Sequence, residues 1–171
     1  MLGLVLLYVG AVLLLNGIWL LGRIDDREIA VINFFAGVVA FLVAVTTAFR
    51  ADADLVTIRG SAFTLLFAFT YLWVGINRFL RTDGRGLGWF CLFVAITAVP
   101  VAFETLRHAA GNTWQIWFGL SWAAWAVLWF LYFLLLVPQQ VGARLTGIVT
   151  IVIAILTAWL PAYLLLTGRL A

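Results

Sequence analysis

The sequence predicts an all-α integral membrane protein whose six transmembrane helices form a single domain over residues 1–171. Composition is the first observation: 66% of the residues are hydrophobic and 10% are charged, whereas soluble domains are about 45–50% apolar and about 25% charged. The second observation is that the charged residues gather in short clusters between long uncharged stretches. The third is that these stretches have the length of roughly 17–25 residues that a helix needs to cross a bilayer.

The uncharged stretches place the helices in order along the chain. The expected helices cover residues 2–21, 29–49, 60–77, 87–103, 114–137 and 145–166. The loops between them are short, and the longest is the polar stretch 50–59. The alternating segments of about ten residues that mark a membrane β-barrel are absent from the sequence, so helices are the predicted spanning elements.

A weak internal repeat indicates how the helices are grouped. The second, fourth and sixth helices each carry a Thr-Ala step, at residues 47–48, 97–98 and 157–158. Internal repeats are common in membrane transport folds, and this one favours three tandem helical hairpins. The dipeptide is short enough to recur by chance, so a bundle without repeats stays open. In the first helix, Gly3, Gly10 and Gly17 share one face, which favours close packing against another helix.

Arginine counts predict the orientation in the membrane. With six spans both termini lie on one side, and the loops of the other side hold six arginines against four on the terminal side. Positive residues near span ends favour the cytoplasmic side. The count therefore predicts that both termini face outward.

Several function classes are excluded by what the chain lacks. Its ten arginines are scattered and give a net charge of only +3, which argues against nucleic-acid binding. The single Cys91 cannot form a disulfide framework, and without a cluster of His, Cys or acidic residues no metal or other cofactor is expected. The short loops leave no room for an enzyme domain. No charged residue lies in mid-span, which argues against an ion-coupled pump.

Three helices carry faces that suit a pore wall. In the fifth helix, tryptophans at i, i+3 and i+7 fall on one face. Aliphatic residues follow helical spacing in the first helix, and a Phe–Tyr pair lies at i, i+4 in the third. These candidate lining residues are Leu2, Leu6, Val9, Leu13, Phe67, Tyr71, Trp122, Trp125 and Trp129. Two interpretations stay open: aromatic residues that pack the bundle or face lipid, and a pore wall of flat π-surfaces.

Polar groups at or near span depth are few. The amides of Asn16, Asn33 and Asn77 need hydrogen bonds if they are buried, and the partner is either another helix or a permeating molecule. Glu104 and His108 lie at i, i+4 near the end of the fourth helix. Histidine titrates near pH ~6.5, so this pair is either a pH switch or an exposed pair without a role.

Six blocks of sequence, one in each span, resemble the AmiS/UreI family of urea and amide channels. The blocks are MLGLVLLYVGAVLLLNGIW, AVINFFAG, FAFTYLWVGIN, WFCLFVAITAVP, WAAWAVLW and ILTAWLPAYLL. The length and short loops look most like the amidase-linked AmiS branch. The resemblance implies a ring of six protomers with lipid at its centre, one pore in each protomer, both termini outside, and a place in the inner membrane of a bacterium. It also implies that the nine candidate lining residues line that pore.

Two departures from the acid-gated member of this family bear on regulation. That member has a long first outer loop that contains histidine, whereas residues 50–59 here are short and contain none. A glutamate near the pore in the last span of that member is matched here by Ile153. We therefore expect no strong acid gating.

The resulting hypothesis is a passive channel, not an enzyme, that conducts urea and short-chain aliphatic amides through a neutral aromatic and aliphatic slot. A cytoplasmic amidase or urease is the expected functional partner. A proton-coupled amide transporter is one alternative. The other is a non-conducting structural subunit in which the tryptophan face is an oligomer interface.

Overall fold

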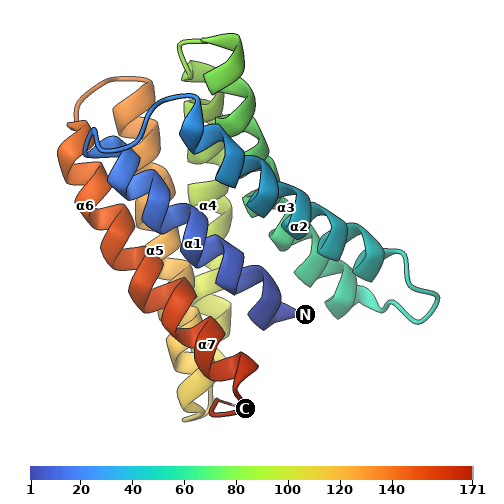
Figure 1. Cartoon of the computed structure of the whole chain (residues 1–171). Coiled ribbons are helices and arrows are strands. Elements are labelled where there is room, and N and C mark those ends of the chain that lie inside the picture. The colour runs from blue at the N-terminus through green and yellow to red at the C-terminus, as the bar shows by residue number, and fades with distance from the viewer. Residues whose placement is uncertain (171) are drawn as a thin grey trace.

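The computed structural model describes residues 1–170 and shows a bundle of helices, with no strand in that part of the chain (Figure 1). The first five crossings are α1 (Leu2–Leu20), α2 (Glu28–Ala48), α3 (Leu55–Leu80), α4 (Arg85–Arg107) and α5 (Thr113–Leu136). The sixth consists of α6 (Ala143–Ile153), the π-helical segment η1 (Ala154–Trp159) and α7 (Leu160–Leu166). All six crossings are long and apolar enough to span a membrane, which confirms the predicted fold class.

Helix α3 begins five residues before the predicted position. The reason is a side-chain cap, because Oδ1 of Asp54 accepts a hydrogen bond from the backbone N–H of Thr57 at 2.8 Å. Such a bond satisfies one of the free N–H groups at the start of a helix. Arg59 therefore lies within α3, and the connection before it shrinks to residues 49–54. Charged residues mark where the membrane ends, and helices extend beyond that point into water.

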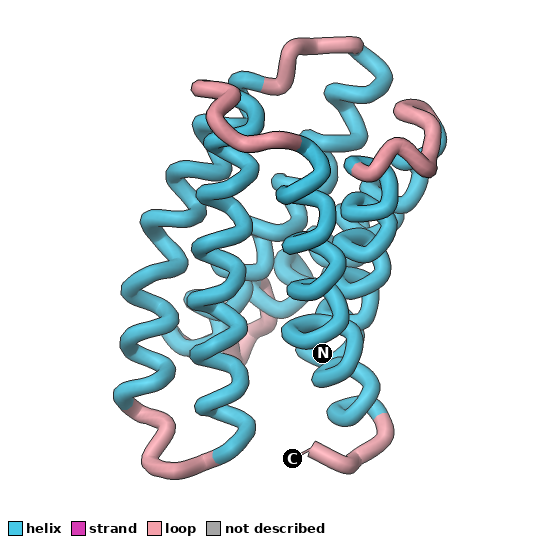
Figure 2. Tube along the Cα trace, turned by 90° about the vertical axis from the view of Figure 1, so that its left-hand side faces the viewer, coloured by secondary structure: helices cyan, strands magenta, loops and turns pink. Residues whose placement is uncertain are grey.

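The helices that pack together most extensively are not the two members of each predicted hairpin. Consecutive helices are antiparallel, as the three predicted hairpins require, and both termini lie at the same end of the bundle (Figure 2). We call this end the terminal side. The most extensive packing joins α2 to α3, α4 to α5, and α1 to the sixth crossing (Figure 1). The two helices of each predicted hairpin therefore belong to two different packed pairs.

Glycines allow the close approach of α1 to the sixth crossing. A Cβ atom built on Gly10 would lie 2.7 Å from the backbone nitrogen of Trp159, and one on Gly17 would lie 2.7 Å from the carbonyl oxygen of Gly147. Neither separation is tolerable for a carbon atom, so both positions require glycine. The predicted packing role of the glycine face is confirmed.

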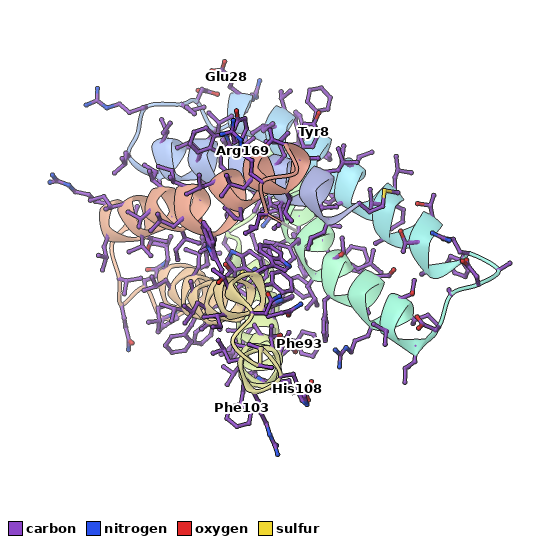
Figure 3. All side chains as sticks on the ribbon, turned by 90° about the horizontal axis from the view of Figure 1, so that it is seen from below. Tyr8, Glu28, Phe93, Phe103, His108 and Arg169 are labelled. Carbon is purple, nitrogen blue, oxygen red and sulfur yellow. The ribbon has the colours of Figure 1, made fainter. Side chains whose placement is uncertain are left out.

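Large apolar side chains cover the outside of the bundle. Phe35 is 62% exposed and Phe103 is 66% exposed, and Phe93 and Phe103 lie on the outside of α4 (Figure 3). Water-soluble proteins rarely expose apolar patches of this extent. The exterior suits lipid, which leaves the interior to hold the functional groups.

Candidate permeation pathway

Three cavities lie one after another along α3, and the first two of them are also lined from α1, α4 and α5. The cavity nearest the termini has a volume of about 280 Å³. From α1 it is lined by Leu2, Val5, Leu6 and Val9, from α3 by Val56, Arg59, Gly60, Phe63, Thr64 and Phe67, from α4 by Val101 and Thr105, and from α5 by Phe118, Trp122 and Trp125. We call it the terminal-side cavity.

The second cavity lies deeper in the bundle and is lined from the same four helices, α1, α3, α4 and α5. It has a volume of about 30 Å³, which is room for a few water-sized molecules. Its lining consists of Leu13, Asn16, Phe67, Thr70, Tyr71, Val74, Leu87, Cys91, Trp125, Leu128, Trp129 and Tyr132. Phe67 and Trp125 line both this inner cavity and the terminal-side cavity, so their rings form the boundary between the two.

The third cavity opens on the side opposite the termini. It is polar, with a volume of about 650 Å³, and is lined by Asp25, Asp26, Arg27, Asn77, Arg78, Arg81 and Thr82. We call it the opposite mouth. Along α3 the lining residues advance from Val56 through Phe67 and Val74 to Arg78, at intervals of three or four residues. One helix face thus runs past all three cavities.

All nine candidate lining residues border the first two cavities. Leu2, Leu6, Val9 and Trp122 line the terminal-side cavity, Leu13, Tyr71 and Trp129 line the inner cavity, and Phe67 and Trp125 line both. Their helical spacing was sufficient to group them, because residues three or four positions apart share a face. Their part in permeation stays a prediction.

The aromatic rings at the boundary meet edge to face. The ring centre of Phe67 lies 4.7 Å from that of Trp129 and 5.0 Å from that of Trp125, and the Phe67 and Trp125 planes are inclined by 83°. Trp122 and Trp125 are inclined to each other by 78°. Edge-to-face pairs are favoured because the positive ring edge meets the negative face. The wall therefore presents ring edges as well as the flat surfaces expected from the sequence.

Threonines hold two of the indoles in place. The indole N–H of Trp125 donates to Oγ1 of Thr157 at 2.8 Å, and that of Trp129 donates to Oγ1 of Thr70 at 3.3 Å. Sequence reasoning did not assign these threonines a role. Thr157 stood out only as part of the Thr-Ala repeat, and nothing in the sequence shows that an indole lies opposite it.

The π-helical segment η1 supplies a further anchor for α5. Its hydrogen bonds run from residue i to i+5, as in the bond from the Leu160 N–H to the Ile155 carbonyl. The next partner in that register, for the carbonyl of Leu156, is Pro161, which has no N–H to donate. The free Leu156 carbonyl instead accepts a bond from the indole N–H of Trp117 at 2.9 Å. Proline and the π-helix together therefore make a docking point for a tryptophan of α5.

The three amides have different surroundings. Asn16 and Asn33 bond each other reciprocally, at 3.1 and 2.7 Å, and Asn33 also donates to the Ile29 carbonyl at 2.9 Å. This pair joins α1 to α2, which answers the open question for Asn33 in favour of an interhelical bond. Asn16 also borders the inner cavity. Asn77 lies at the opposite mouth, where its Oδ1 accepts a bond from the hydroxyl of Thr82 at 2.8 Å.

Glu104 and His108 do not pair through their side chains. The His108 Nδ1 lies 2.8 Å from the backbone carbonyl of Glu104. The Glu104 carboxylate instead forms an exposed ion pair with Arg59 at 3.4 Å, which links α4 to α3. Because Arg59 borders the terminal-side cavity, the charged group nearest that cavity is an arginine that already has an acidic partner.

Comparisons with known proteins identify the family. A protein of Mycolicibacterium smegmatis, whose name describes a transporter of amidate substrates, is 40% identical over 168 residues, which cover 98% of this chain and 77% of that protein. The acid-activated urea channel of Helicobacter pylori strain J99 is 38% identical over an alignment of 191 residues, gaps included, which covers 96% of this chain and 97% of that protein. The cryoEM structure of the Helicobacter pylori urea channel in its closed state superposes with a TM-score of 0.89 at 37% identity over all of both chains.

The match is not confined to one part of the molecule. The family described as AmiS/UreI family transporter covers residues 1–169, and these include all six crossings and every residue that borders the three cavities. The chain therefore belongs to the AmiS/UreI family of membrane transporters.

Proposed function

We propose that this protein is a passive channel for urea and short-chain aliphatic amides. The observation that carries the proposal is the row of cavities, whose inner member is lined by aliphatic, aromatic, hydroxyl, thiol and amide groups without any carboxylate, guanidinium or imidazole. The names of the relatives, which describe urea and amidate substrates, agree with a permeant that is small, polar and uncharged.

The slot excludes ions because its wall lacks groups that could replace their hydration water. An ion enters a narrow passage only where protein groups replace its hydration shell, and ring faces and methyl groups cannot do so. A planar neutral amide loses less hydration energy, and its N–H groups make weak contacts with aromatic faces. Because these contacts are individually weak, the permeant is not trapped, and fast passage requires that.

Strong acid gating is not part of the proposal. The terminal-side connection of residues 49–54 contains no histidine. A hydrogen bond and charge from Arg50 hold the pKa of Asp52 below its usual value, and hydrogen bonds from Thr57 do the same to the pKa of Asp54. Both carboxyls therefore stay ionised in mildly acidic solution, so this connection has no group that responds there.

The remaining proposals concern the cellular setting. Six arginines lie in the loops and helix ends of the side opposite the termini, against four on the terminal side. This difference supports an orientation with both termini on the outer side of the inner membrane of a bacterium. The family resemblance supports a homohexameric ring with lipid at its centre. A channel of this kind would supply a cytoplasmic amidase or urease, which consumes the permeant and so maintains inward flux.

Neither alternative gains support from the structure. A proton-coupled transporter needs an ionisable group within a span, and the acidic residues and His108 all lie in connections or at helix ends. In a structural subunit the tryptophan face would lie on the outside. Instead Trp122, Trp125 and Trp129 are all buried within the protomer.

Stopped-flow light scattering of proteoliposomes tests the proposal. Vesicles that contain the protein should shrink and reswell faster than empty vesicles when challenged with urea or acetamide, and glycerol should gain much less. Rates equal to those of empty vesicles would refute a channel. Uptake that requires a pH gradient would favour the coupled transporter instead.

A further inference from the structure

The opposite mouth contains a buried amide whose donor is unused. Asn77 is only 4% exposed, and its Oδ1 accepts the hydrogen bond from Thr82. Its Nδ2 has no hydrogen-bond partner among residues 1–170. Leaving a buried donor unpaired costs about 1–3 kcal/mol, and native proteins pair such groups almost always. This amide group is therefore suited to a ligand that brings its own acceptor.

Asn77 stands on the face of α3 that lines the pathway. Thr70 and Val74 border the inner cavity, and Asn77 follows three residues later and borders the opposite mouth. Residues at this spacing lie next to each other on a helix surface. A molecule that leaves the inner cavity along α3 therefore meets Asn77 next.

Most of the side-chain N–H groups deeper in the slot are already occupied. The amide of Asn16 donates to Asn33, and the indoles of Trp125 and Trp129 donate to Thr157 and Thr70. A carbonyl oxygen that has lost its water in the slot therefore finds both indole N–H groups occupied, and of the Asn16 amide only the second N–H is left. At the mouth, the Nδ2 of Asn77 is available to it.

Arg78, beside Asn77, adds a positive charge to this mouth. Its guanidinium carbon lies 5.0 Å from the ring centre of Trp19, and one of its nitrogens lies 3.7 Å from a carboxylate oxygen of Asp26. The Nε of Arg78 is also buried without a hydrogen-bond partner in the described residues. Both residues with an unused donor line one cavity, which favours a ligand with an acceptor oxygen.

We propose that Asn77 is a specificity-determining residue whose Nδ2 donates a hydrogen bond to the carbonyl oxygen of urea or an amide at the opposite mouth. This inference rests on the proposed channel function and adds a point of recognition to it. The bond replaces water at the end of the apolar slot, which lowers the barrier for carbonyl compounds. A thiocarbonyl sulfur, a weak acceptor, gains much less.

The test compares urea with thiourea in proteoliposomes of the full-length protein. Asn77→Val removes the donor, and Asn77→Asp removes it while keeping side-chain size and an acceptor for Thr82. A single hydrogen bond corresponds to a factor of about 2 to 10 in rate. We expect the urea-to-thiourea flux ratio to fall by that factor in both variants, with thiourea flux unchanged. Gln140→Val, which removes an exposed amide on the same side but outside the mouth lining, should leave the ratio unaltered.

The other possible results of this experiment separate a failure of the proposed Asn77 role from a failure of the channel proposal. An unchanged ratio, or an equal fall in both fluxes, overturns the role of Asn77 and leaves the channel proposal standing. If wild-type protein excludes thiourea, the urea flux of variants with an unchanged melting temperature becomes the readout, and flux equal to wild type overturns the inference. If wild-type protein conducts neither urea nor acetamide, the channel proposal fails and this inference fails with it.

Discussion

Replacing Thr157 by valine tests whether η1 positions the aromatic wall. The Thr157 hydroxyl accepts the indole N–H of Trp125 at 2.8 Å, and Trp125 is only 2% exposed. Valine has a similar shape but no acceptor, so the N–H loses its partner. An unpaired buried donor costs about 1–3 kcal/mol, whereas polar contacts between membrane helices average about 0.6 and reach about 1.7 kcal/mol. We expect a loss of unfolding free energy of about 1–2 kcal/mol.

The same change should alter selectivity, because Trp125 borders both the terminal-side and the inner cavity. Without its hydrogen bond the indole is free to leave its position at the boundary. Since about 1.4 kcal/mol corresponds to a factor of ten, a loss of about 1–2 kcal/mol limits the fall in the urea-to-glycerol flux ratio in proteoliposomes to about 5- to 30-fold. Unfolding in mixed micelles measures the accompanying change in stability.

Thr46→Val is the matched control. The Thr157 hydroxyl donates to the carbonyl four residues earlier, that of Ile153, at 2.6 Å, and the Thr46 hydroxyl makes the same kind of bond to Leu42 at 2.6 Å. The Thr46 side chain, however, is exposed on the outside of α2. This variant should keep the wild-type flux ratio. If Thr157→Val loses stability yet keeps the wild-type ratio, the threonine only stabilises the fold and the positioning argument is refuted.

Two further predictions concern packing and pH. Gly10→Ala places a carbon 2.7 Å from the Trp159 backbone nitrogen, so we expect size-exclusion chromatography to show loss of the folded protein. A Cβ atom on Gly60 would meet no other part of residues 1–170 within 4 Å, so Gly60→Ala should give the same yield of folded protein as wild type. Equal yields of the two variants would contradict the packing argument. The lowered pKa values of Asp52 and Asp54 mean that the stability these carboxylates contribute is present above pH ~3.9 and is lost only as pH falls through the lowered values. Neither carboxylate changes its charge between pH 5 and pH 7.5, so this connection gives no reason for gating. We expect similar urea flux at outside pH 5 and pH 7.5, and strong activation at pH 5 would disprove the absence of gating.

The membrane class and the number of spans followed from local properties of the chain. The free energy of placing a residue in a bilayer depends mainly on its own side chain, so a row of uncharged residues is sufficient to predict a span. Helix ends were less predictable. The early start of α3 depends on the hydrogen bond between Asp54 and Thr57, which extends the helix into water, where hydropathy carries no information.

The candidate site, too, was predictable only in part from the sequence. Periodicity grouped Trp122, Trp125 and Trp129, because helical geometry determines which residues share a face. It contained no information about what lies opposite them. That Phe67 meets the rings of Trp122 and Trp125 edge to face and that Thr157 accepts one indole N–H depends on contacts between residues far apart in the chain.

The three asparagines show most clearly which features the sequence determines and which depend on the tertiary structure. By itself the sequence determined that an amide near span depth must find a hydrogen-bond partner, since burial without one is costly. Only the tertiary structure decided that Asn16 and Asn33 satisfy each other while Asn77 keeps a free donor at the opposite mouth. The physical reason is that a hydrogen bond depends on distances of about 3 Å between separate helices, and these distances exist only once the bundle has packed.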